Sequence, residues 1–141
     1  IGLLFTAAAT NAAVIQNSTV SYTNSGGTAG RTATLTALAG GHIPATPTVG
    51  TIVWFSLQAG DTGVRSIENI TLNTSLVTGS VSLLIARDVA SIGPTVANIP
   101  ATRTLSAPGV RLYNSTCMLH CILASATTAT FFNGELTVQE K

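Results

Sequence analysis

The strongest constraint on the fold of this chain is a period-two alternation of β-branched or large apolar residues with small polar ones. Because successive side chains of a β-strand point to opposite faces, this period is typical of half-buried strands, and no helical period competes with it. The sequence therefore predicts an all-β protein. The alternating segments are 18–23, 32–38, 51–57, 67–74, 80–87 and 130–138.

Turn-forming residues separate these segments at a spacing of roughly 10 to 15 residues. Short strands joined by Gly- and Pro-containing loops indicate a β-sandwich, jelly roll or small barrel. We expect a jelly-roll-like β-sandwich of about eight short antiparallel strands. No shift in composition divides the 141 residues, so we expect a single domain over 1–141. The turn segments are 24–30, 39–50, 61–63, 91–100 and 107–109.

The two ends of the chain leave alternatives open. Residues 1–16 begin with an apolar run that lacks the charged start of a secretory signal, so we expect them in the mature chain. They would form either an N-terminal strand of the chain's own core or an arm that lies on a neighbouring subunit. Near the other end, Asn133-Gly134 is a hairpin signal, but each half of that hairpin would be a very short strand. We therefore expect a single C-terminal strand, with Gly134 at a bulge or a close packing contact.

Charged residues are scarce. Asp, Glu, Lys and Arg make up 8% of the chain, whereas about a quarter is usual, and serine and threonine supply the polarity instead. The 45% hydrophobic share is dispersed, without the roughly 18 consecutive apolar residues of a membrane span. The net charge is only +1 and the arginines are scattered, so the sequence contains no basic patch that would bind nucleic acid. We therefore expect neither a membrane nor a nucleic-acid partner, and a surface that is covered in an assembly.

The segment Cys117-Met118-Leu119-His120-Cys121 is the most suggestive cluster for chemistry. A zinc site would need further ligands at matching spacing, and only His42 remains, so we expect no metal. In a strand the Cα atoms of Cys117 and Cys121 would lie roughly 13 Å apart, beyond the limit of about 7 Å for a disulfide. We expect two free, buried thiols, which fits synthesis in a reducing cytosol.

A hydrolase would need a nucleophile, a base and an orienting group in reach of one another. His42 or His120 could be combined with Asp61 or Asp88, but no nucleophile motif such as G-x-S-x-G is present. The acidic residues show no paired-carboxylate or calcium-loop spacing either. We therefore expect no enzymatic activity, no catalytic residue and no cofactor.

The aromatic side chains are candidates either for the core of the sandwich or for a subunit interface, where aromatics are enriched and charges are depleted. Phe131 and Phe132 are adjacent and would face opposite sides of their strand. One could fill the core while the other fills an interface. The candidate interface residues are Phe5, Trp54, Tyr113, Phe131 and Phe132.

Four stretches in the second half of the chain carry a resemblance: GVRSIENITL at 63–72, GSVSLLIAR at 79–87, RLYN at 111–114 and ATTAT at 126–130. These stretches resemble β-rich virion proteins of tailed bacteriophages. The resemblance covers roughly residues 63–141 and consists of a strand-like residue pattern rather than a diagnostic motif. It implies a capsid-associated or fibre-associated structural protein, often a jelly-roll-like unit that assembles as a trimer, and it brings no catalytic residue.

These observations together predict a non-enzymatic virion structural protein assembled in the bacterial host cytoplasm. The leading hypothesis is a decoration or cement protein that forms a homotrimer, packs on the major capsid protein and stabilises the head. One alternative is a head or tail fibre domain. Another is an extracellular pilin or adhesin subunit whose N-terminal strand completes the sheet of its neighbour.

Overall fold

The computed structural model describes residues 1–36 and 40–87. The chain groups into two units, Ile1–Ser91 and Ile92–Lys141, and all of the described residues belong to the first. The single domain over 1–141 stays a prediction. Outside the described residues lie the predicted strand at 130–138, both cysteines, His120, Tyr113, Phe131 and Phe132.

The described residues are all strand and connection, without a helix, so the all-β prediction is confirmed. Eight strands follow one another along the sequence. They are β1 (Gly2–Ala7), β2 (Ile15–Gln16), β3 (Thr19–Asn24), β4 (Arg31–Leu35), β5 (His42–Ile43), β6 (Ile52–Ser56), β7 (Val64–Thr71) and β8 (Ser80–Leu84).

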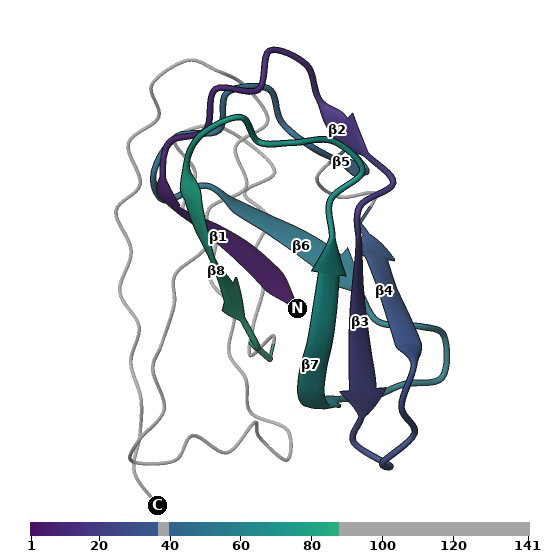
Figure 1. Cartoon of the computed structure of the whole chain (residues 1–141). Coiled ribbons are helices and arrows are strands. Elements are labelled where there is room, and N and C mark those ends of the chain that lie inside the picture. Colours follow the sequence, from purple (N-terminus) through teal and green to yellow (C-terminus); the bar gives the residue numbers. More distant parts are fainter. Residues whose placement is uncertain (37–39, 88–141) are drawn as a thin grey trace, which may run out of the picture. The chain divides into compact units, whose positions relative to one another are not determined.

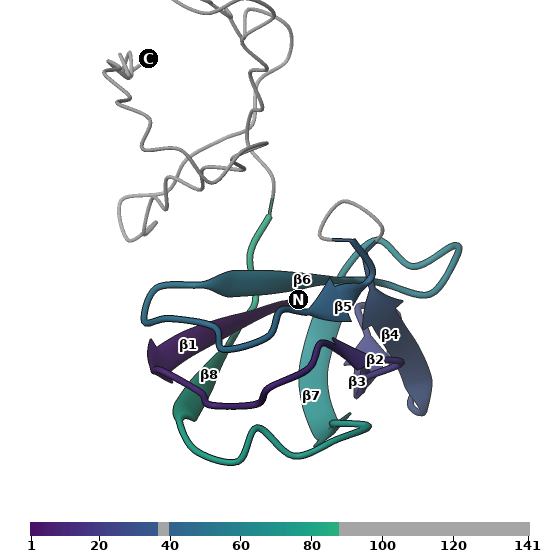
Figure 2. The same ribbon diagram turned by 90° about the horizontal axis from the view of Figure 1, so that it is seen from above.

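Six of these strands form one curled antiparallel sheet in the order β7-β3-β4-β6-β1-β8, and β2 pairs with β5 in a small second sheet (Figures 1 and 2). Strand β6 joins the two halves of the large sheet. Its first half pairs with β1, where Trp54 lies opposite Gly2. Its second half pairs with β4, where Phe55 lies opposite Leu35.

Strand β1 lies inside the large sheet. It pairs with β6 on one side and with β8 on the other, with a register shift between Phe5 and Ala7. Of the two roles that the sequence leaves open for the N-terminal segment, residues 2–7 therefore take that of a strand in the chain's own sheet.

The core lies on the inner face of the curled sheet, where the alternation places the apolar side chains. Val20 and Tyr22 on β3 are fully buried, while Ser21 between them is partly exposed. Ile15 and Ile43, which are register partners in the small sheet, join the same core. The buried apolar residues are Ile1, Leu3, Phe5, Ala9, Ile15, Val20, Tyr22, Ala33, Ile43, Val53 and Phe55.

Candidate functional site: a charge-free loop end

Three connections meet at one end of the large sheet, across the top of the view in Figure 1. They are residues 8–14 between β1 and β2, residues 44–51 between β5 and β6, and residues 72–79 between β7 and β8. Together these residues are called the loop end. Function is often carried by loops that a rigid sheet holds in place, so this end is the first candidate for a binding surface.

Hydrogen bonds join the first loop to the other two. The Ala9 amide donates to the Pro47 carbonyl at 3.0 Å, and the Thr10 amide donates to the Leu76 carbonyl at 3.3 Å. The hydroxyl oxygens of Thr10 and Thr78 lie 2.9 Å apart and share a further hydrogen bond. The loop end is therefore one connected surface and not three independent loops.

Asn11 ties the first loop to the second from inside. Its side chain is 3% exposed, and its Nδ2 donates to the carbonyls of Ala13 at 2.9 Å and Pro44 at 3.1 Å. The backbone carbonyl of Asn11 accepts from the Thr46 backbone amide at 3.0 Å. A buried amide with several backbone partners fixes the geometry of irregular chain, because breaking these bonds would leave buried polar groups unpaired.

No residue of the loop end carries a charge. Its outer surface consists of alanine, threonine, serine, asparagine and glycine, with three exposed valines. Val14 is 45% exposed, Val49 65% and Val77 70%, one on each loop. Scattered exposed valines are ordinary, but three on one connected surface without charge form a candidate contact for another protein.

The charged side chains of the described residues all lie elsewhere: Arg31, Asp61, Arg65, Glu68 and Arg87. Two of them meet at the opposite end of the sheet, where the Arg31 Nε donates to the Asp61 Oδ2 at 2.9 Å. Glu68 lies on the outer face of β7 and accepts hydrogen bonds from Thr23 at 2.6 Å and Ser21 at 3.0 Å. These bonds, first from Thr23 and then from Ser21, lower the pKa of Glu68.

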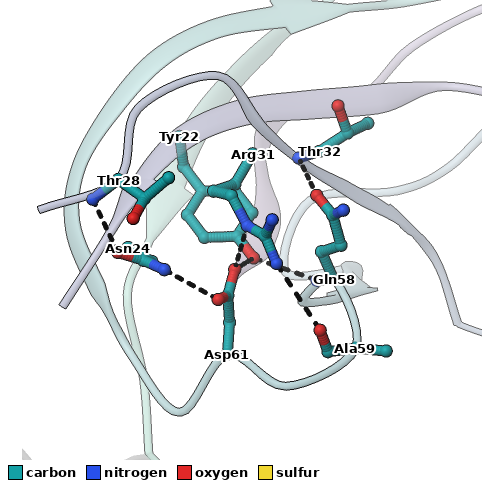
Figure 3. A network of polar contacts seen from close by, with 8 residues as sticks. All are labelled: Tyr22, Asn24, Thr28, Arg31, Thr32, Gln58, Ala59 and Asp61. Atoms are coloured by element: carbon teal, nitrogen blue, oxygen red, sulfur yellow. Dashed lines mark hydrogen bonds and ion pairs between the residues drawn. The ribbon is translucent and has the colours of Figure 1, made fainter. Parts of the chain in front are cut away.

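Asp61 is the centre of a polar network at that opposite end (Figure 3). Besides Arg31, its carboxylate accepts from the Tyr22 hydroxyl at 2.6 Å and from the Asn24 amide at 2.8 Å. Hydrogen bonds from Arg31, Tyr22 and Asn24 to the charged form lower the pKa of Asp61 from 3.8 to about 2. Burial and the bond to Asp61 raise the pKa of Tyr22. The Tyr22 oxygen also accepts from the Gln58 amide at 2.9 Å, which ties the 57–63 connection to β3.

This network holds the fold together and is a poor candidate for catalysis. A general base must be free to take up a proton near neutral pH, whereas three donors occupy the Asp61 carboxylate. His42, which a hydrolase would pair with it, has its Nδ1 2.8 Å from the Gly40 carbonyl. No hydrogen bond joins His42 to Asp61 within the part of the chain that the structure describes. In the same residues no group of three or more His, Cys, Asp or Glu side chains could hold a metal ion.

Two of the five candidate interface residues lie in the described part of the chain. The structure places Phe5 in the core, fully buried, so of the two roles left open for it Phe5 takes the core role. Trp54 is partly exposed and lies on the face of β6 opposite to the buried Val53 and Phe55. Neither belongs to the loop end. Among the described residues no aromatic side chain marks this candidate surface, which the missing charges and exposed valines define instead.

Comparison with known proteins gives no relative: no family model, no curated protein and no solved structure matches the chain. Among residues 1–36 and 40–87 no helix is long and apolar enough to cross a membrane.

Proposed function

We propose that the protein is a non-enzymatic structural subunit of a virion, a decoration or cement protein that packs on the major capsid protein and stabilises the head. The observation that carries the proposal is the charge-free loop end. A surface that stays in water normally carries charged groups, which keep proteins soluble and apart. This end carries none and exposes three valines, as expected for a surface that is covered in the assembled state.

The same proposal accounts for the composition of the whole chain. Burying a charge at an interface is costly unless it is paired, whereas methyl groups and hydroxyls can be packed or hydrogen-bonded without that cost. A subunit surrounded by copies of itself and by capsid subunits gains from replacing charge with threonine and valine. We propose a jelly-roll-like sandwich for the complete chain and a homotrimer as its assembled form, made in the host cytoplasm.

The position of β1 favours a discrete oligomer over a pilin-like filament. In strand complementation the N-terminal strand leaves its own subunit and pairs with the next one. Here β1 is hydrogen-bonded to β6 and to β8 of its own chain. Donating it would break two ladders and remove Leu3 and Phe5 from the core. A head or tail fibre domain remains as an alternative within the virion.

The virion assignment is tested on particles purified from the phage that encodes the chain. Quantitative mass spectrometry should find the protein in the particles in a fixed ratio to the major capsid protein, and electron microscopy should place it on the head. A few copies confined to the tail would support the fibre alternative. Absence from intact particles would contradict the proposal.

A further inference from the structure

Val77 lies near the end of the 72–79 loop, three residues before β8, in a backbone conformation that valine rarely adopts. Its φ is +66°, in the left-handed region that is unfavourable for β-branched residues. The Thr78 amide donates to the Leu76 carbonyl at 2.8 Å across it, which closes a tight γ-turn. The Ser75 hydroxyl accepts from the Val77 amide at 3.0 Å on the other side.

The surroundings hold this conformation in place. Leu76 packs against the core and Thr78 is bonded to Thr10, so both neighbours of Val77 are fixed. Gly79, at φ +103°, lies so close to the first loop that a Cβ there would come within 2.9 Å of the Ala8 carbonyl oxygen. The turn cannot relax without moving the 8–14 loop.

The Val77 side chain is not part of the core of its own chain. At 70% exposure it is the most exposed large apolar side chain of the described residues. Glycine or asparagine would adopt the same φ at lower cost. Within the described residues the other non-glycine positions with positive φ are Asn17, where φ is +57°, and Thr46, where it is +45°. Both strained β-branched residues, Thr46 and Val77, therefore lie in the loop end. Unfavourable conformations of this kind cluster where a protein binds or acts.

We propose that Val77 is the anchor of the contact between copies of this chain, and that it packs against the loop end of a second copy. This inference rests on the proposed function, because it specifies which surface makes the contact between subunits. A second copy fits better than a charged partner since the loop end of a neighbouring copy is itself uncharged and partly apolar, whereas an unpaired partner charge would lose its water against this surface. A small apolar side chain on a rigidly held backbone costs little entropy to bury.

The test compares two substitutions of Val77 in the full chain, with thermal unfolding and light scattering measured on each. Val77→Asn relieves the unfavourable φ and removes the apolar contact. It should raise Tm by about 2–5 °C and weaken self-association about tenfold or more. Val77→Ile keeps both the strain and the apolar contact. It should therefore leave Tm unchanged and the association constant within about twofold of the wild-type value.

A stability gain for Val77→Asn without loss of association would overturn the anchor role. A lower Tm for Val77→Asn would overturn the anchor role too, because it would show that the valine side chain stabilises the fold of its own chain. A third substitution, Val49→Asp, places a charge on the same surface but on another loop. It shows whether a failed prediction concerns only the Val77 anchor or the whole contact surface of the proposed function. If Val49→Asp abolishes association and Val77→Asn does not, the contact surface stands and the anchor fails. If neither substitution affects association, both fail.

Discussion

The indole ring of Trp54 lies directly against Gly2, its register partner on the neighbouring strand β1. A Cβ built on Gly2 would lie 2.7 Å from Cζ3 of the indole and 3.0 Å from Cε3. Only glycine leaves room for the ring there. Covering a glycine with an aromatic side chain from the adjacent strand restores packing that glycine itself cannot provide.

Gly2→Ala should therefore destabilise the protein. The added methyl group forces the indole away from β1, and overpacking of this kind costs about 1–3 kcal/mol. Urea unfolding followed by fluorescence measures the loss, and Trp54 is the chain's single tryptophan. The control is Gly26→Ala, where the new Cβ would meet only the Asn24 Oδ1 at 3.4 Å. An equal effect of both substitutions would show that the ring does not lie on Gly2.

Tyr22→Phe should lower the free energy of unfolding by about 1–3 kcal/mol. Phenylalanine preserves the ring in the core but leaves the Gln58 amide without its acceptor and Asp61 without one of its donors. Chemical denaturation measures the change. Ser21→Ala on the same strand removes an exposed hydroxyl bond to Glu68 and should cost less than about 0.5 kcal/mol. If Tyr22→Phe were as mild as this control, the network would not hold the 57–63 connection.

Stability should fall in acid in a way that depends on Asp61. Hydrogen bonds in the folded state lower the pKa of Asp61 from 3.8 to about 2. Its stabilising contribution is therefore complete above about pH 4 and is lost as the pH falls from about 4 to about 2. The lowered pKa of Glu68 adds a loss of the same sign.

The difference between two melting curves isolates the Asp61 contribution. Asp61→Asn should melt below the wild type at pH 7, and the gap between the two Tm values should narrow as the pH drops toward about 2. A gap that stays constant down to about pH 2 would contradict the network's role.

The sequence predicted most of the long strands because a single physical rule generates them. The five alternating segments that fall wholly or partly in the described residues overlap β3, β4, β6, β7 and β8. In the segment at 80–87, Val81 and Leu83 are the register partners of the buried Phe5 and Leu3 on β1, and Val81 packs against the core. Strand β1 itself carries leucine on both faces, at Leu3 and Leu4, so alternation could not identify it.

Features that depend on contacts distant in sequence could not be predicted. The two-residue strands β2 and β5 are too short for any period, and pairing between Ile15 and Ile43 defines them. The bond from Tyr22 to Asp61 joins residues 39 positions apart. The absence of charge at 8–14, 44–51 and 72–79 can be read from the sequence. That these stretches meet on one surface follows only from the fold.

Self-association of the purified chain, measured by light scattering over a range of protein and salt concentrations, tests the central claim most directly. Between about 0.01 M and about 1 M ionic strength the Debye length falls from about 30 Å to about 3 Å, which suppresses attraction between exposed charges. We predict a discrete oligomer, most simply a trimer, whose association is unchanged across this range. Val49→Asp should dissociate it, whereas Ala29→Asp, on the exposed turn between β3 and β4, should not. A stable monomer at all concentrations, an oligomer that salt dissociates, or equal effects of the two substitutions would contradict assembly through the charge-free loop end.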